Sequence, residues 1–298
     1  MGVAADPATE VAWTPAAPYD LRGSLGWSDL TRQVAGGLLD LAFPTAAGPA
    51  TARVWQRRDG DVCARLVAPD DASAHDRLAE MLTIALDTRP FLELAAGDPL
   101  LAPLVTRLRG LRPLLLSTPV HALIRGVCGQ LIRGSEAAAI ERRILRELGT
   151  SQGRFTLAPD AATLAAARPA LLERAGLSPR RAVVLVRAAR RLRLDALATE
   201  PVERARTRIL REPGLGRWTA GVLMLYGFGR HELGLSGDLG LVRLARALSV
   251  DELRLLDRYG EWQGMASLWL LRHPLAGRHS TGVRRPDRAA SAASPRPS

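Results

Sequence analysis

Hydrophobic and polar residues alternate over part of the first third of the chain, which predicts β-strands. The alternating segments 52–56 and 62–67 flank Asp59-Gly60, a pair typical of a tight turn between antiparallel strands. Apolar residues then recur with a helical spacing over residues 74–86. Strands followed by a helix predict a small α+β domain.

After Pro113 the apolar residues follow a helical spacing almost throughout. Short connections with Pro or Gly separate the helical segments, which is typical of a compact all-α domain. The predicted helical segments are 119–148, 159–172, 179–192, 200–211, 218–228, 239–248 and 264–271. We place the α+β domain at residues 18–112 and the all-α domain at 113–278. Residues 1–17 and 279–298 are expected to be disordered because their composition is biased and lacks periodicity.

The formal net charge of the chain is +11. The segment 279–298 holds four arginines and one aspartate, a net charge of +3, which leaves +8 for the rest of the chain. Positive charge in excess over the whole body favours a polyanion such as nucleic acid as the partner. On charge alone, a basic, soluble enzyme with no polyanionic partner fits equally well.

The side-chain inventory excludes several chemistries. All 41 basic residues are arginine, so no lysine is available for a Schiff base, and only the α-amine remains as a primary amine. Cys63 and Cys128 are too few for a four-cysteine iron–sulfur cluster, and we expect free thiols. The five histidines show no metal-ligand spacing, so we predict neither a metal nor a cofactor. No apolar run is long enough for a membrane span and no leader is apparent, which predicts a cytoplasmic protein.

The segment 213–238 combines a glycine-rich turn, an apolar helix and a single carboxylate. Its first residues, Pro213-Gly214-Leu215-Gly216, lie between two helical patterns, and glycines there can adopt positive φ and admit a phosphate to the backbone N–H groups. Asp238 ends the segment, directly before the next predicted helix. An aspartate at that place can serve as an N-cap or as a reactive anion, and the two roles are compatible.

This order of hairpin, helix and aspartate resembles the signature of the helix-hairpin-helix DNA glycosylases. The segments 110–113, 129–132, 176–182 and 262–272 are similar to the branch of DNA-3-methyladenine glycosylase II type, and the resemblance covers roughly residues 18–273. It implies a TATA-binding-protein-like α+β domain followed by an all-α helix-hairpin-helix domain. It also implies a monomer that acts on double-stranded DNA containing damaged bases.

The resemblance assigns roles to individual residues. It implies that Asp238 is catalytic and that Trp218 and Trp27 line the base pocket, although both tryptophans also fit core positions. The residues implied in DNA binding are Gly214, Leu215, Gly216, Arg217, Gln130 and Leu131, with Leu131 as the wedge that fills the vacated base stack. As a bare pattern, a leucine in a helix is far more often a core residue, and only the resemblance favours the wedge.

Three departures from the family pattern bear on the reaction. Trp218 occupies the place where lyase-competent relatives carry lysine, which implies a monofunctional enzyme that cuts only the N-glycosidic bond. Val222 and Leu271 replace residues that are often aromatic in the family, and Arg133 stands where serine is usual. A less aromatic pocket would select less by cation–π stacking. The function that the resemblance implies is removal of alkylated purines such as 3-methyladenine from duplex DNA during base excision repair. The alternatives are a glycosylase for oxidised or deaminated bases and a noncatalytic DNA-binding protein.

Overall fold

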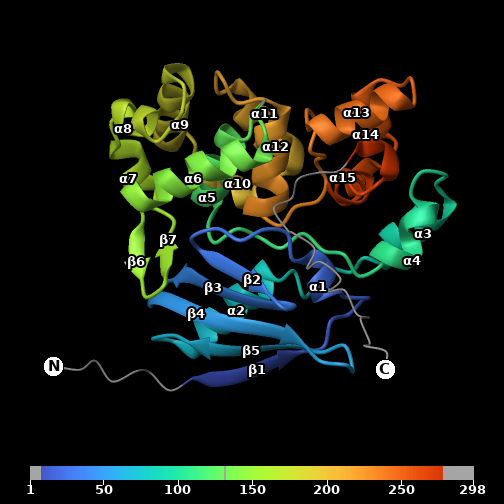
Figure 1. Ribbon diagram of the computed structural model, residues 1–298, viewed down its shortest axis with the longest axis horizontal. Helices are drawn as coiled ribbons and strands as arrows, with labels where there is room; N and C mark the ends of the chain where they lie inside the picture. The colour runs from blue at the N-terminus through green and yellow to red at the C-terminus, as the bar shows by residue number, and fades with distance from the viewer. Residues whose placement is uncertain (1–7, 131, 278–298) are drawn as a thin grey trace, which may run out of the picture.

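The computed structural model describes residues 8–130 and 132–277. An antiparallel sheet forms one layer, and helices from the rest of the chain form a second layer above it (Figure 1). The sheet has the order β1-β5-β4-β3-β2. Its strands are β1 (Thr9–Trp13), β2 (Arg32–Ala35), β3 (Leu38–Thr45), β4 (Gly48–Gln56) and β5 (Val62–Val67). The predicted hairpin about Asp59-Gly60 is confirmed, since it joins β4 to β5.

The expectation of disorder over residues 1–17 is wrong for its described part. Thr9–Trp13 pair with Val62–Leu66 along the edge of the sheet. The alternation within β1 is short, and its hydrogen-bonding partner lies some fifty residues further along the chain, so local composition could not show it. Residues 1–7 lie outside the described part of the chain.

One face of the sheet is covered by α2 (Asp71–Met81), whose side chains Ala74, Leu78 and Met81 are buried in the same core as Val54 and Leu66. This helix confirms the one predicted over residues 74–86, with an end five residues earlier. Asp70 begins it by accepting a hydrogen bond from the Ala72 amide.

The helical layer contains more and shorter helices than the sequence predicts. The predicted segment 119–148 is two helices, because Gly129 ends the first and the second begins only at Gly134. The segment 159–172 is interrupted in the same way before Pro169, which starts a new helix. These helices are α5 (Pro119–Cys128), α6 (Gly134–Leu148), α7 (Ala161–Ala166), α8 (Pro169–Arg174), α9 (Pro179–Arg191), α10 (Leu194–Thr199) and α11 (Val202–Arg211).

The remaining helices carry the chain through the motif of residues 213–238 to its C-terminal part. A π-helical turn, Leu223–Gly227, extends α12 towards the loop before α13. The elements are α12 (Arg217–Val222), α13 (Leu239–Ala247), α14 (Glu252–Asp257) and α15 (Gln263–Leu270). No helix in residues 8–130 and 132–277 is long and apolar enough to cross a membrane.

The sequence patterns also missed other elements, among them α10, α14 and those described next. The two-stranded hairpin of β6 (Thr150–Gln152) and β7 (Phe155–Leu157) reaches from the helical layer down to β3, where Ala42 packs against Phe155. The helices α3 (Arg89–Gly97) and α4 (Val105–Leu108) pack with the C-terminal helices, since Phe91 shares a core with Trp269. The packing therefore differs from the predicted domain boundary at residue 112: the helical layer begins to form at α3.

Buried Arg112 ties the two layers together. Its guanidinium donates to the carbonyl oxygens of Ala17 and Thr83, each at 3.1 Å, and to that of Pro18 at 3.2 Å. Its neighbour Gly110 lies so close to Asp20 that an added Cβ would approach the Asp20 nitrogen to 2.6 Å. The segment 110–113 therefore has a structural task at the junction between the layers.

Candidate active site and nucleic-acid interface

The glycine hairpin lies between α11 and α12, exposed at the surface. Gly214 has φ +90°, and a Cβ there would approach Val184 Cγ2 to 2.4 Å. Gly216, at φ −105°, has extended backbone, so only the first of the two hairpin glycines uses the left-handed region predicted for both. No described side chain caps the start of α12, so its first N–H groups are left for solvent or for an anion.

Side chains from other elements hold the hairpin in place. Gln130 Nε2 donates to the Gly214 carbonyl oxygen and to Thr219 Oγ1, both at 3.0 Å, and Arg187 donates to the Pro213 carbonyl oxygen. Leu215 is buried, which anchors the hairpin to the helical core. Gln130 thus has an intramolecular task in this structure, and its contact with DNA stays a prediction.

Arg217 is exposed in the first turn of α12, next to the uncapped N–H groups. A depression of about 400 Å³ lies beside the hairpin, between it and α9, and Arg180 and Arg187 are among the residues that line it. The surface around the hairpin is therefore cationic, as a phosphate backbone requires. The predicted wedge, Leu131, lies outside the described residues.

Asp238 is the N-cap of α13. Its backbone is extended, at φ −64° and ψ 131°, and its Oδ1 accepts a hydrogen bond of 2.7 Å from the Gly240 amide. The side chain is half-buried and follows Gly237, which has φ +89°. The cap and the positive end of the helix dipole both favour a fixed carboxylate at this position.

The loop that presents Asp238 is fastened to α15. The Leu235 amide donates to Ser267 Oγ at 3.0 Å, and the Gly234 amide donates to Gln263 Oε1 at 3.4 Å. Ser267 is fully buried, so this attachment is protected from solvent. These contacts explain how a loop of small residues holds one carboxylate in a defined place.

Trp218 lies beside that loop. A Cβ on Gly237 would be 3.8 Å from Trp218 Cβ, and one on Gly129 would be 3.2 Å from the Trp218 ring. The ring is half-buried and packs against the same core as Leu271. The structure therefore brings two of the predicted site residues, Trp218 and Asp238, into one neighbourhood.

Trp27 is enclosed by charged groups. The guanidinium carbons of Arg125 and Arg32 lie 4.0 Å and 4.6 Å from its ring centroid, and its Nε1 donates to Asp29 Oδ2 at 3.1 Å. Tyr226 meets the ring edge-on at a centroid distance of 5.6 Å. These contacts occupy Trp27 with arginines of the protein itself, which weakens its predicted role as a wall for a cationic base.

Tyr226 joins the surroundings of Trp27 to those of Asp238. Burial raises the pKa of the Tyr226 hydroxyl, and the nearby Asp238 carboxylate raises it further, whereas Arg272 and Arg125 oppose this shift. Tyr226 therefore lies close enough to interact electrostatically with both the Asp238 carboxylate and the arginines around Trp27. It is a candidate site residue that the sequence patterns did not single out.

No protein-family model matches the chain. The chain is 25% identical over 203 residues to a DNA-3-methyladenine glycosylase of Bacillus subtilis, an alignment that covers 62% of this chain and 67% of that protein. The structure of this chain is similar to that of a 3-methyladenine DNA glycosylase from Archaeoglobus fulgidus, with a TM-score of 0.76 and 18% identity. The match covers 88% of this chain and 97% of that one.

The structure is also similar to an 8-oxoguanine glycosylase/lyase of Clostridium acetobutylicum, with a TM-score of 0.71, 15% identity and coverage of 92% of this chain and all of that one. The chain has the fold of the helix-hairpin-helix DNA glycosylases. The predicted resemblance is thereby confirmed. Because glycosylases for different bases share this fold, the fold does not select the base.

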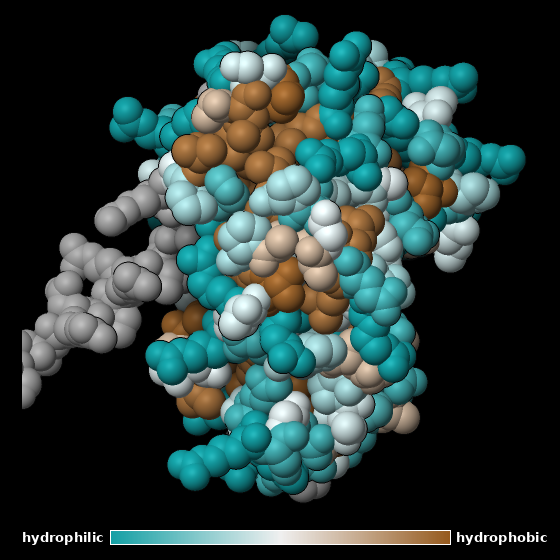
Figure 2. Space-filling view, turned by 90° about the vertical axis from the view of Figure 1, so that its right-hand side faces the viewer, coloured by the Kyte–Doolittle hydropathy of each residue, from teal (hydrophilic) through white to brown (hydrophobic). Residues whose placement is uncertain are grey.

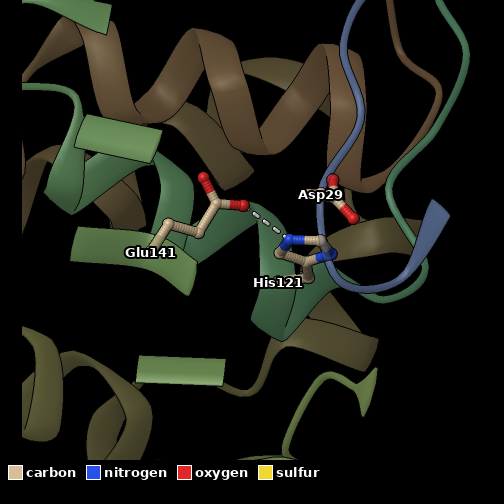
Figure 3. A group of neighbouring side chains, drawn as sticks. All are labelled: Asp29, His121 and Glu141. Carbon is tan, nitrogen blue, oxygen red and sulfur yellow. Dashed lines mark hydrogen bonds and ion pairs between the residues drawn. The ribbon is translucent and has the colours of Figure 1, made fainter. Parts of the chain in front are cut away.

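Within this fold, Asp29, which accepts from the Trp27 indole N–H, belongs to a buried charge cluster with His121 and Glu141 (Figure 3). His121 Nε2 and Arg125 both contact Glu141 Oε1, at 2.7 Å and 2.6 Å, and Asp29 lies on the other side of the imidazole. Ser117 Oγ lies 3.2 Å from His121 Nδ1. The cluster connects the segment before β2 to the consecutive helices α5 and α6, which lie about ninety residues further along the chain.

The electrostatics of this charge cluster fit ion pairing rather than a metal site. Burial raises the pKa of Asp29, but His121, Arg32, Arg125 and the Thr31 hydroxyl outweigh it and lower the value to about 2. Burial likewise raises the pKa of Glu141, and Arg125 and His121 hold it below its usual value. Two guanidiniums already neutralise the two carboxylates, so a divalent cation would have to displace them.

Some large apolar side chains remain exposed on the helical layer. Figure 2 shows apolar side chains gathered mainly over the upper, helical part of the face that it presents. Leu239, directly after Asp238, and Leu275 are both large apolar residues that remain about half exposed. Val222, at one of the positions often aromatic in the family, is instead fully buried in the core.

Proposed function

We propose that this protein is a monofunctional DNA glycosylase. It acts as a monomer on duplex DNA and hydrolyses the N-glycosidic bond of alkylated purines such as 3-methyladenine, in base excision repair. The antiparallel sheet corresponds in this proposal to the TATA-binding-protein-like domain of the family. The named activities of the relatives in Bacillus and Archaeoglobus support the choice of base.

The observation that carries the proposal is the place of Asp238. The carboxylate is fixed at the N-terminus of α13, beside Trp218, on a loop that follows the exposed hairpin. Breaking an N-glycosidic bond builds positive charge on the sugar, which a fixed carboxylate stabilises. Asp238 would also orient the attacking water. An alkylated purine that already carries positive charge needs little help from a general acid.

The proposal of a monofunctional reaction rests on the residues at hand. A lyase reaction through a Schiff base needs an amine, and the chain contains no lysine. Trp218 lies at the position where lyase-competent relatives carry that group. In the proposed role, its ring forms one wall of the pocket for a base turned out of the duplex.

A second candidate substrate class is a neutral damaged base, such as an oxidised guanine. The observation that favours it is the pair of guanidiniums over the Trp27 ring, since a cationic base gains nothing from an aromatic ring already occupied by cations. The similarity to an 8-oxoguanine glycosylase/lyase is consistent with this class. Both classes use Asp238 in the same role.

The deciding experiment measures release of free base from duplex DNA by the purified protein. Methylated DNA and DNA with a single 8-oxoguanine are tested in parallel, and Asp238→Asn is compared with the parent protein. We expect release of 3-methyladenine by the parent and a loss of about 10²-fold or more in the variant, because the fixed charge is gone. Strand cleavage at the abasic product should be absent.

Two results would contradict the proposal. Release of base by Asp238→Asn at the parent rate would remove Asp238 from the reaction. Binding of DNA by both proteins without release of any base would favour the noncatalytic alternative. Release of 8-oxoguanine alone would keep the glycosylase and change the substrate class.

A further inference from the structure

A single long-range contact fixes the residue next to Asp238. The Gly237 amide donates a hydrogen bond of 2.9 Å to Glu252 Oε1, which projects from the first turn of α14. Gly237 has φ +89°, a conformation that a residue with a side chain rarely adopts. Glu252 thus holds a left-handed turn one residue before the carboxylate.

The other attachments of this loop stop earlier in the chain. Ser267 and Gln263 hold the amides of Leu235 and Gly234, and the Asp238 amide turns back to the Leu235 carbonyl oxygen at 3.1 Å. Among the described residues, the contact with Glu252 is therefore the side-chain attachment nearest to Asp238 on the N-terminal side of the loop. Without this contact, the described side-chain attachments before Asp238 end at Leu235, and the turn at Gly237 is restrained less firmly.

We propose that Glu252 is a positioning residue for Asp238, which orients the carboxylate by fixing the Gly237 amide. This inference rests on the proposed glycosylase function and adds a residue to it. An error of about 1 Å in the place of a reacting group can cost 10²-fold in rate, so the turn at Gly237 bears directly on catalysis.

The charges around Glu252 support a specific role for its carboxylate as the acceptor for the Gly237 amide. Burial raises the pKa of Glu252, and the Asp251 and Asp238 carboxylates raise it further, while the Gly237 amide and Arg217 oppose this. A carboxylate beside two other carboxylates is electrostatically unfavourable. The hydrogen bond to Gly237 and the proximity of Arg217 offset that cost. Arg217 is also the exposed residue next to the hairpin, so the same cation borders the DNA interface.

The test compares Glu252→Ala with Glu252→Gln, because glutamine keeps an oxygen that can accept from the Gly237 amide and removes only the charge. Asp257→Ala is the matched control, since Asp257 is exposed on the same helix. We expect Glu252→Ala to lower kcat about tenfold with KM within about twofold, and Glu252→Gln to recover most of the loss. Amide hydrogen exchange at Gly237 should accelerate in Glu252→Ala and stay slow in Glu252→Gln.

Each outcome decides the inference. Equal kcat in Glu252→Ala and Asp257→Ala, in folded proteins, would overturn it. So would unchanged protection of the Gly237 amide in Glu252→Ala, or a Glu252→Gln variant as slow as Glu252→Ala. If the parent protein releases no base, the proposed function itself fails, which is distinct from a failure seen only in the Glu252 variants.

Discussion

At the residue scale, the two glycines of the hairpin differ in backbone conformation and in the space that is available for a side chain. Gly214 needs its hydrogen side chain for two reasons, a positive φ and the proximity of Val184. Gly216 has an ordinary extended backbone, and a Cβ there would meet no atom within 4 Å. The first glycine therefore serves the fold, whereas the second leaves open space on the exposed side of the hairpin.

This difference predicts that substituting Gly214 lowers stability, whereas substituting Gly216 weakens DNA binding. Gly214→Ala should lower the free energy of unfolding by about 1 to 3 kcal/mol, because it combines backbone strain with a clash against a buried side chain. Gly216→Ala should leave that free energy nearly unchanged and weaken DNA binding, since its methyl group stands where the phosphate backbone would approach. Urea unfolding and a DNA titration at one fixed salt concentration measure the two quantities.

The two variants serve as controls for each other. If Gly216→Ala binds DNA as tightly as the parent, the hairpin backbone does not approach phosphate at this residue. Equal stabilities of Gly214→Ala and the parent would show that the turn relaxes without cost.

The charge cluster acts at the scale of elements, because it joins the Trp27 segment to α5 and α6. Asp29 receives the Trp27 indole N–H and lies beside Arg32 and Arg125, with its side chain only 4% exposed. Removing one partner from such a set leaves a buried charge without compensation, which is costly. The cluster therefore determines where the Trp27 ring lies relative to Tyr226.

Asp29 should also make stability depend on pH. Its pKa is about 2 in the folded protein and near 3.8 without these contacts, so its ionised form contributes stability above about pH 4. That contribution is lost as the pH falls from about 4 towards 2. Asp29→Asn should cost about 2 kcal/mol at pH 7 and flatten the fall in unfolding free energy between about pH 4 and 2.

Urea unfolding at several pH values tests this, with Asp76→Asn as the control because the Asp76 side chain is 87% exposed. If the unfolding free energies of Asp29→Asn and the parent follow parallel curves against pH, the folded protein does not lower the pKa of Asp29.

At the scale of elements, the predicted helices can be compared with the observed ones, and the unpredicted contacts can be explained. Helices with a strong apolar period, such as α9 and α13, lie where that period places them, and Asp238 is the N-cap that its position suggested. The cluster of Asp29, His121 and Glu141 was not predictable, because no spacing in the sequence joins these three segments. Tyr226 and Glu252 were missed for a related reason: their contacts are set by tertiary packing rather than by periodicity.

At the scale of the whole molecule, the positive charge is spread over the body and the C-terminal segment. Residues 279–298, which lie outside the described part of the chain, carry +3 of the net charge of +11. DNA binding releases about 0.9 counterion for each phosphate neutralised. The contribution of this segment to binding is therefore measurable as a change in salt dependence, separately from the reaction proposed at Asp238.

Removal of residues 279–298 should weaken binding to undamaged duplex DNA and reduce the slope of log K against log salt concentration by up to about 3, because no more than about three phosphate contacts are lost. The rate of base release at saturating enzyme should stay the same, since Asp238, Trp218 and the hairpin lie in the body. A salt series with the full chain and the truncated chain measures the slopes, and single-turnover base release supplies the control. Superimposable salt curves would show that the segment takes no part in DNA binding. A lower single-turnover rate would instead place it near the reacting base.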